Sequence, residues 1–240
     1  MCPRPLPARL GQDDDDPGRM LLAIATVDRS GSACVLDDAG RELAFADLAG
    51  APTEAQLVPL IDRLITDHGR PDRLAVAVGP GSFTGLRTGI TAVRTLAWLE
   101  QVAVYPVDSL AATAVMAGDG CWWVLLPLKK DTTFHGIFRV YGDRIETVLA
   151  SVAIEDSAPP PVLPDDAIAL GPGIIAKPVL LHGRRSGNPA SPNARGVARL
   201  AVSAASAASA VSPSPVPWDR LLPVYGQEPA PVLQRQRGQS

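Results

Sequence analysis

The sequence contains few of the residues that build disulfide frameworks, zinc sites or nucleic-acid surfaces. Its cysteines, Cys2, Cys34 and Cys121, are too few and too widely spaced for a disulfide framework or a zinc site, both of which need ligands close together. The 22 basic residues are almost all arginine and are spread along the 240-residue chain, whose formal net charge is -3. These absences exclude a disulfide-stapled domain and the basic stripe of a nucleic-acid-binding protein.

Long hydrophobic runs and histidine clusters are also missing. No apolar run reaches the roughly 20 residues of a membrane span, and residues 1–19 lack the apolar stretch of a signal peptide. The histidines, His68, His135 and His182, lie in different segments without a partner at helical spacing, so no metal site is expected. We therefore expect a soluble protein of the reducing cytoplasm that does not contact a membrane.

The first half of the chain begins with strands. Residues 1–19 are rich in Pro and Asp, which predicts a disordered extension, and Met20 is an alternative start of translation. An apolar run from Met20 predicts a buried strand, and two alternating runs around Asp37–Gly40 predict a hairpin.

Helices then alternate with buried strands up to residue 118. Apolar residues at helical spacing predict a helix over 53–67, with Thr53 and Gln56 as a capping box and Pro59 bending it or delaying its start. A buried strand, a helix over 86–99, another strand and a helix capped by Ser109 follow. This alternation predicts mixed sheets covered by helices.

The second half, residues 119–226, starts again with strands. Three strand-like runs repeat the opening of the first half, and a Pro- and Asp-rich loop over 155–166 follows them. An Ala-rich segment after Asn193 has helical spacing, with Asn193 as its N-cap. Residues 227–240 are expected to form a loose tail.

A glycine-rich turn, "GPGSFTGLRTG", stands between a buried strand and the helix over 86–99. Its position suits anion binding, because backbone N–H groups and the positive end of the helix dipole point out of a helix start. The residue types of the turn do not match a phosphate-binding motif. A P-loop needs Gly-Lys-Ser/Thr, whereas here Arg87 follows Gly85 by two residues. The alternative is structural: a tight turn, a cap from Ser82 or Thr84, and close packing at Gly85. Both interpretations concern the same residues: Gly79, Pro80, Gly81, Ser82, Phe83, Thr84, Gly85 and Arg87.

Other chemical signals are weaker. Ser82 has no nearby His and no G-x-S-x-G elbow, which argues against a hydrolase. Asp28 and Asp131, from the two halves, would suit magnesium-dependent phosphoryl transfer if they met, but surface loop carboxylates are commoner. The acidic run Asp13–Asp16 is interpreted as a solvated tail.

The eleven residues Gly79–Gly89 resemble the signature of the bacterial TsaB family, also called YeaZ, which has a Gcp-like domain. The resemblance continues through "VDSLAA" and returns in "NARGVARLA" and "LLPVYG", so that it covers about residues 20–226. It implies an α/β fold of the ASKHA type, the duplicated architecture of actin-like ATPases, with mixed sheets flanked by helices. It also implies a non-catalytic subunit that supports threonylcarbamoylation of adenosine in tRNA.

The resemblance implies partners as well. Family members bind a transferase subunit, TsaD, largely through helices of the N-terminal half, and an ATPase, TsaE, joins them. It follows that no cofactor is expected and that tRNA is contacted only through the complex. Exposed apolar helices would also allow the chain to form a homodimer when its partner is missing. The expected interface consists of apolar residues on the two helices: Leu57, Val58, Leu60, Ile61, Leu64, Ile65, Ile90, Val93 and Trp98.

Three stretches depart from the family pattern. The usual Ile-Asp-Thr-Ser at the end of the first strand is Ile24–Val27 here, so that Ala25 replaces the carboxylate that ASKHA enzymes use near metal and phosphate. The stretches Thr53–Ala55 and Pro127–Phe134 also differ, the former on the expected partner-facing helix. The first change weakens an ATPase interpretation. The second indicates either a divergent interface or one that has co-varied with its own TsaD.

Two classes of function therefore compete. The leading hypothesis is the non-catalytic partner subunit, and the alternative is a nucleotide-dependent phosphotransferase or hydrolase that uses the Gly79–Gly85 turn for phosphate. A peptidase, suggested by the family's older glycoprotease label, lacks a visible nucleophile with its base. Apolar residues outside the main stripes of both helices suit a partner surface, but equally a deeply buried helix. An exposed apolar face shared by the two helices would favour the first hypothesis.

Overall fold

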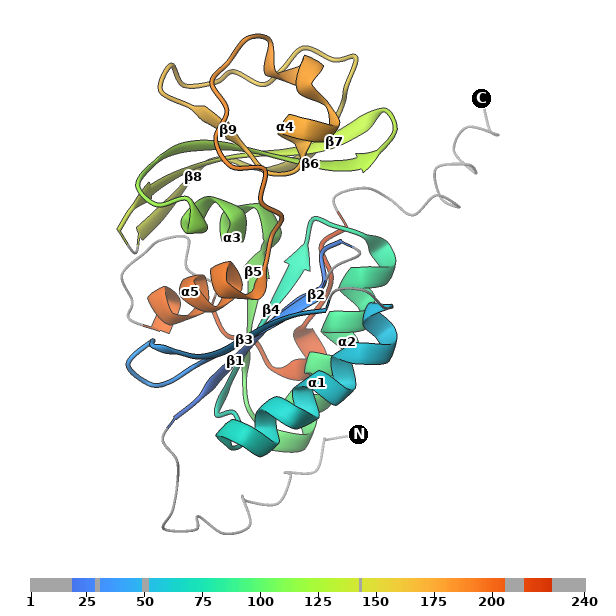
Figure 1. The fold of residues 1–240 in the computed structure, drawn as a ribbon, viewed down its shortest axis with the longest axis vertical. Coiled ribbons are helices and arrows are strands. Elements are labelled where there is room, and N and C mark those ends of the chain that lie inside the picture. Colours follow the sequence, from blue (N-terminus) through green and yellow to red (C-terminus); the bar gives the residue numbers. More distant parts are fainter. Residues whose placement is uncertain (1–18, 29–30, 49–51, 143, 206–213, 226–240) are drawn as a thin grey trace.

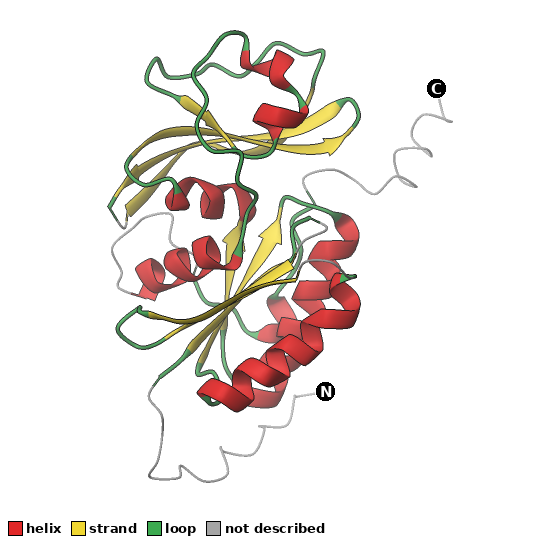
Figure 2. Ribbon diagram, in the orientation of Figure 1, coloured by secondary structure: helices red, strands yellow, loops and turns green. Residues whose placement is uncertain are grey.

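The computed structural model describes residues 19–28, 31–48, 52–142, 144–205 and 214–225. Within these residues the chain forms alternating layers of helices and sheets, as Figures 1 and 2 show. The predictions for residues 1–18 and 227–240, including Cys2 and the run Asp13–Asp16, lie outside the described residues.

The first sheet has five strands in the order β3-β2-β1-β4-β5. The antiparallel β1 and β2 are followed by β3, and the turn between β2 and β3 confirms the hairpin predicted at Asp37–Gly40. Strands β4 and β5 run parallel to β1, as the helices between them require. The bounds are β1 Leu21–Ala25, β2 Gly31–Leu36, β3 Glu42–Leu48, β4 Arg73–Gly79 and β5 Val104–Asp108.

The second sheet has four strands in the order β8-β7-β6-β9. Its antiparallel β6, β7 and β8 and its parallel β9 repeat the order of the first four strands of the first sheet. The duplicated α/β architecture with mixed sheets flanked by helices is therefore confirmed. The bounds are β6 Gly120–Lys129, β7 Thr132–Tyr141, β8 Arg144–Glu155 and β9 Ile168–Leu170.

The helices cover both faces of the first sheet. Helices α1 (Thr53–His68) and α2 (Phe83–Glu100) lie side by side on its outer face, whereas α3 (Ser109–Met116) and α5 (Ala194–Ala205) lie between the two sheets (Figure 1). The short α4 and the 3-10 helix η1 cover the far face of the second sheet. The bounds of the short helices are α4 Gly173–Ala176, η1 Pro178–Leu181 and η2 Trp218–Arg220.

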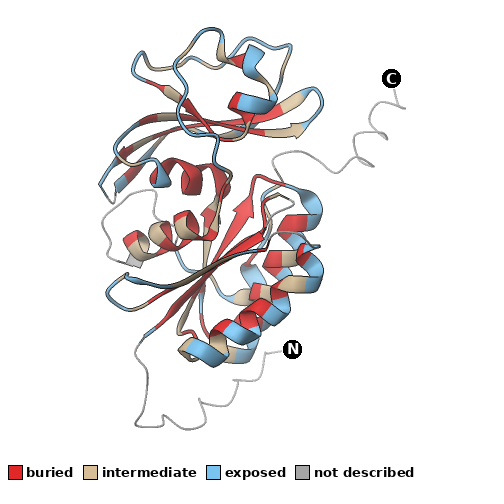
Figure 3. Ribbon diagram, viewed as in Figure 1, coloured by how far each residue is buried: buried red, intermediate tan, exposed pale blue. Residues whose placement is uncertain are grey.

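Strand β1 shows why the first sheet needs a continuous apolar run. Leu22 and Ile24 belong to the core beneath α1 and α2, whereas Leu21 and Ala23 belong to the core around α3 and α5. Successive side chains of a strand point to opposite faces, so both faces of β1 are buried (Figure 3). Complete burial of each large side chain contributes about 1.5–3 kcal/mol.

Two of the predicted helix caps are wrong. Helix α1 begins at Thr53 itself and its N-cap is Pro52, which has no side-chain oxygen, so the capping box is not formed. Helix α3 is capped by Asp108, one residue before the predicted Ser109, because the Asp108 carboxylate accepts bonds from the amides of Leu110 at 2.8 Å and Ala111 at 2.9 Å. Burial raises the pKa of Asp108, and these bonds oppose the rise.

Two other predicted caps are confirmed. Helix α2 has Ser82 as its N-cap, although it begins at Phe83, three residues earlier than predicted. The side-chain oxygen of Asn193 accepts a 3.0 Å bond from the amide of Arg195 at the start of α5. Ser and Asn at these positions satisfy amides that have no partner within the helix.

The end of the chain returns to the first sheet. Helix α5 packs on β1 and β2, and its Arg195 binds Glu42 of β3 through two 2.7 Å bonds. Residues 214–225, which we call the C-terminal strap, then pass beside β5, where Val216 bridges Val104. Both segments belong to the second half in sequence but contact the first half in space.

Candidate docking groove and the glycine-rich turn

The glycine-rich turn is packed against backbone from two other parts of the chain. Gly79 has a φ of +129°, and a Cβ there would lie 2.1 Å from the carbonyl oxygen of Val224 in the strap. A Cβ at Gly85 would lie 2.3 Å from the carbonyl oxygen of Thr26, which follows β1. Glycine is therefore required at both positions by close backbone approach, and at Gly79 by its backbone conformation as well.

The same packing occupies groups that would otherwise hold a phosphate. The Ser82 amide donates a 2.7 Å bond to the carbonyl of Val27, and the Gly85 amide donates a 3.3 Å bond to the Ser82 hydroxyl. Carbonyl oxygens of Thr26 and Asp28 face Gly85, and these oxygens would repel an anion. The geometry favours the structural interpretation of the turn.

The two carboxylates considered for phosphoryl transfer come from different sheets, as the two halves of the sequence suggested. Asp28 follows β1 of the first sheet, whereas Asp131 lies in the turn between β6 and β7 of the second. Among the described residues, no group of three or more His, Cys, Asp and Glu side chains could hold a metal ion. A cavity of about 200 Å³ lies where β5, α3 and α5 meet β7 and β8, and Asp108 is the charged residue in its lining, which does not suit a phosphate.

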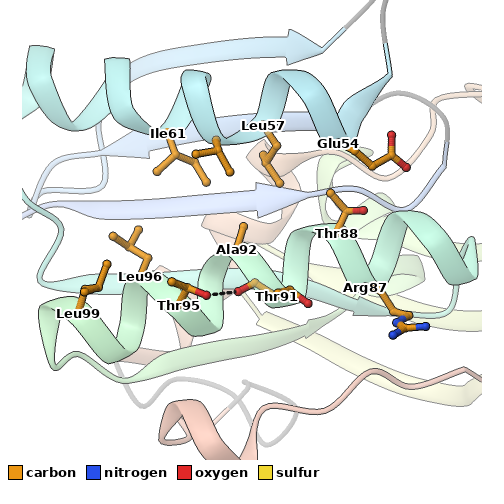
Figure 4. A pocket seen from close by; sticks show the side chains of 11 residues that line it. Glu54, Leu57, Ile61, Arg87, Thr88, Thr91, Ala92, Thr95, Leu96 and Leu99 are labelled. Carbon is orange, nitrogen blue, oxygen red and sulfur yellow. Dashed lines mark hydrogen bonds between the residues drawn. The ribbon is translucent and has the colours of Figure 1, made fainter.

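The larger hollow is a groove of about 550 Å³ between α1 and α2 on the outer face of the first sheet. Its floor is apolar, because Leu57 and Ile61 of α1 point toward α2, where they meet Leu96 and Ala92 (Figure 4). The complete lining is Glu54, Leu57, Val58, Ile61, Arg87, Thr88, Thr91, Ala92, Thr95, Leu96 and Leu99.

Large apolar side chains on and beside the rim of this groove are exposed. Val58 of α1 is 62% exposed and Leu99 of α2 is 60% exposed, and both line the groove. Trp98, next to Leu99 but on the other side of α2, is 46% exposed. Exposed apolar side chains gathered around a groove indicate a binding surface, because water contact with this area is unfavourable.

Thr88, Thr91 and Thr95 form the ridge of α2 between these side chains, and the hydroxyls of Thr88 and Thr95 are satisfied within the helix. Thr88 donates a 3.0 Å bond to the carbonyl of Thr84. Thr95 donates a 3.0 Å bond to the carbonyl of Thr91 (Figure 4). Because the hydroxyls of Thr88 and Thr95 already have acceptors, covering these two side chains does not leave a buried donor without a partner. The ridge can thus be buried against another helix at small cost.

One end of the groove is polar. Glu54 of α1 and Arg87 and Thr88 of α2 lie at the end where both helices begin, whereas Ile61, Leu96 and Leu99 lie farther along (Figure 4). The groove therefore presents an apolar length with charged groups at one end, which fits an amphipathic helix and gives it a direction.

The structure separates the interface residues expected from the sequence into three groups. Val58 and Trp98 are exposed and Ile65 is partly buried, so their side chains reach the surface. Leu57 and Ile61 are buried but form the groove floor. The rest belong to the core beneath both helices: Leu60, Leu64, Ile90 and Val93.

Sequence reasoning missed part of this surface. Thr91, Thr95 and Leu99 line the groove although they lie outside the apolar stripe that was used to define the helix. Their positions on the exposed side of α2 could have been read from helical spacing, once the start of α2 at Phe83 was known. No helix among the described residues is both long and apolar enough to span a bilayer.

Comparisons with known families and curated proteins each match part of the chain. The family model described as TsaD, tRNA N6-adenosine threonylcarbamoyltransferase, matches residues 48–121. The protein of Haemophilus influenzae named tRNA threonylcarbamoyladenosine biosynthesis protein TsaB is 32% identical over 102 residues, which are 40% of this chain and 43% of that protein. The Bacillus subtilis protein of the same name is 30% identical over 79 residues, which are 32% of this chain and 34% of that protein. The matches thus span less than half of these curated relatives.

Solved structures extend the likeness to most of the fold. YeaZ from Pseudomonas aeruginosa superposes with a TM-score of 0.74 at 23% identity, covering 86% of this chain and 99% of that one. A second Pseudomonas aeruginosa structure, of an uncharacterized protein with similarity to peptidase YeaZ, superposes with a TM-score of 0.72 at 23% identity, covering 87% of this chain and 100% of that one. At this identity the likeness shows a shared fold.

Proposed function

We propose that this chain, as a member of the TsaB/YeaZ family, takes part in the biosynthesis of threonylcarbamoyladenosine on tRNA. The relatives, the fold and the family model support this proposal. Within that process it acts as a non-catalytic subunit that binds a transferase of the TsaD type. A TsaE-type ATPase joins this complex, and tRNA is reached only through it.

One observation carries the binding role: the groove between α1 and α2 has an apolar floor and uncovered apolar rims. Val58 and Leu99 expose 62% and 60% of their surface beside it. A helix of the partner that filled the groove would cover both side chains, and each one fully buried contributes about 1.5–3 kcal/mol. The same surface explains a homodimer when the transferase is missing, since a second copy also offers two helices.

The glycine-rich turn supports the proposal in a different way. Its close contacts with Thr26, Val27 and Val224 fix the position from which α2 starts. The turn therefore sets the angle of α2 relative to the sheet, and with it the width of the groove. We assign it this structural role and no part in catalysis.

The proposal is tested with the protein and the TsaD-type transferase of the same organism. Co-expression should give a complex that survives purification and dissociates in the micromolar range or below. Removal of the gene should abolish the modified nucleoside in total tRNA, as measured by mass spectrometry. Failure to form a complex at micromolar concentration, with the modified nucleoside still present after gene removal, would contradict it.

A further inference from the structure

The C-terminal strap runs along α2 on the side away from α1. Val216 pairs with Val104 of β5, and the short helix η2 packs on α2. Leu221, which follows η2, is fully buried in the core beneath α2. The strap ends where the amide of Val224 donates a 2.7 Å bond to the carbonyl of Val78. Figure 1 shows this red segment against α2. Helix α2 therefore has α1 on one side and the strap on the other.

The strap completes an aromatic cluster around Arg87 at the start of α2. Its Tyr225 stacks on Phe83, with ring centroids 4.8 Å apart. The guanidinium carbon of Arg87 lies 5.2 Å from the centroid of the same Phe83 ring. Because Tyr225 holds Phe83 and Phe83 attracts the guanidinium, Arg87 is kept beside the groove that it lines.

A second site with an arginine and aromatic residues lies farther along α2. A hollow of about 420 Å³ is lined by Arg94, Trp98, Thr91 and Thr95 of α2 and by Trp218 of the strap. Thr91 and Thr95 also line the groove between α1 and α2, so the two hollows adjoin across the threonine ridge. Arg94 thus shares a hollow with one aromatic residue of α2, Trp98, and one of the strap, Trp218.

Neither arginine has an acidic partner within the described part of the chain. No ion pair or hydrogen bond is formed there by the side chain of Arg87 or Arg94, whereas nearby Arg70 pairs with Glu100 at 3.3 Å. Arg87 and Arg94 are seven positions apart on one helix, so they lie on the same side of it, roughly 10 Å apart along its axis.

We propose that Arg87 and Arg94 bind two carboxylates, spaced by about two helical turns, on the segment of the transferase that covers α2, and that the strap is part of this interface. The inference rests on the proposed function and specifies the chemistry of its partner. Arginine suits this role because its planar guanidinium binds a carboxylate through two parallel bonds while its face lies on an aromatic ring.

A protein partner explains the surroundings better than RNA does. Arg87 lines the apolar groove, with Glu54 at the same end, and Arg94 lines the adjoining hollow. The chain carries a net charge of -3. The phosphate backbone of RNA is bound by extended basic stripes. Two isolated guanidiniums do not form such a stripe, and exposed Val58 and Leu99 lie beside them. Acidic side chains on an amphipathic helix match both the apolar and the basic parts of this surface.

The test measures the dissociation constant of the full-length complex for charge-reversed variants. Arg87→Glu and Arg94→Glu should each weaken binding about tenfold at low salt, and the double variant about a hundredfold, with less effect at high salt. Arg144→Glu, an exposed arginine of β8 on the other sheet, is the matched control and should bind normally. Trp218→Ala should weaken binding, whereas Trp218→Phe should restore most of it. Thermal melts of each variant show that the fold is kept.

The outcomes separate this inference from the function on which it rests. If the arginine variants bind the transferase normally while Leu99→Asp does not, the inference is wrong and the groove still docks the partner. If Leu99→Asp and Val58→Asp also bind normally, the groove is not the docking site. If the wild-type chain forms no complex, the proposed function itself fails. A loss of affinity for tRNA in the isolated variants, with unchanged affinity for the transferase, would assign the arginines to RNA and overturn the inference. Restored binding by an acidic-to-basic change on the partner would confirm the pairing.

Discussion

The amide of Ser82 and the carbonyl of Val27 are joined by a 2.7 Å hydrogen bond that ties the start of α2 to the end of β1. The start of α2 resembles a phosphate site in sequence, but its Ser82 amide already donates to a carbonyl of the chain's own backbone. An anion could use this amide only if the bond broke and the carbonyls around Gly85 moved away.

Isolated protein should therefore give no heat on titration with ATP and magnesium, up to millimolar nucleotide. Mixing with the transferase before the titration shows whether a site appears only in the complex. Micromolar affinity of the isolated chain for ATP, reduced by a change at Ser82, would instead support the nucleotide-dependent enzyme.

Replacement of Gly85 by alanine should destabilise the protein by about 3 kcal/mol, because one added methyl group must displace α2 from the backbone of Thr26. The matched control is Gly187→Ala. An added Cβ there meets atoms no closer than 3.7 Å, so the change should stay within about 0.5 kcal/mol of wild type. Urea denaturation measures both. Equal midpoints for the two variants would show that the turn does not need glycine at this position.

Acid should weaken the second half of the protein through His135. Its Nδ1 accepts a 3.1 Å bond from the indole N–H of Trp123, and its Nε2 is buried without a partner among the described residues. Burial lowers the pKa of His135 from 6.5 to about 4. The unfolded chain therefore binds this proton more readily, so the stabilisation is complete above pH 6.5 and is lost as the pH falls toward 4.

The expected loss from this group is about 2 kcal/mol between roughly pH 7 and pH 5, measured by urea denaturation. His135→Gln, which keeps an acceptor for Trp123, should remove that part of the pH dependence. His68→Gln, at the end of α1, should leave it unchanged. If His135→Gln kept the full pH dependence, another group would be responsible.

The bond between Arg195 and Glu42 should add modestly to stability by holding α5 against β3. The two 2.7 Å bonds are bidentate, and the guanidinium carbon lies 3.6 Å from the centroid of the Phe45 ring. Both charged side chains are about two-fifths exposed, at 41% and 39%, so Arg195→Ala should cost only about 1 kcal/mol. Arg195→Lys should recover little of this stability, since lysine lacks the planar guanidinium that binds both carboxylate oxygens. An undiminished effect in high salt would show that stacking, not charge, dominates.

Local sequence patterns predicted most of the fold, because the strands and helices of the first half have clear periodicity. The continuous apolar run of β1, the hairpin at Asp37–Gly40 and the cap at Ser82 all depend on neighbours within a few residues. The cap of α3 was misplaced by one residue because Asp108 and Ser109 are both good N-caps and spacing alone does not separate them.

The remaining features depend on contacts between residues far apart in sequence. Nothing near Val216 or Tyr225 indicates that the strap returns to α2, since it crosses more than 100 positions to do so. The floor of the groove could be foreseen from Leu57 and Ile61. The threonine ridge and the adjoining hollow at Trp218 could be recognised only in the packed structure.

The most direct test of the account is the dissociation constant of the complex with the transferase when the groove alone is altered. Val58→Asp and Leu99→Asp place charge on its two rims, and Val162→Asp is the matched control, because Val162 is 96% exposed on the loop before β9. The account predicts that each groove variant weakens binding by about a hundredfold or more and that Val162→Asp binds like wild type. Wild-type affinity in both groove variants would contradict it.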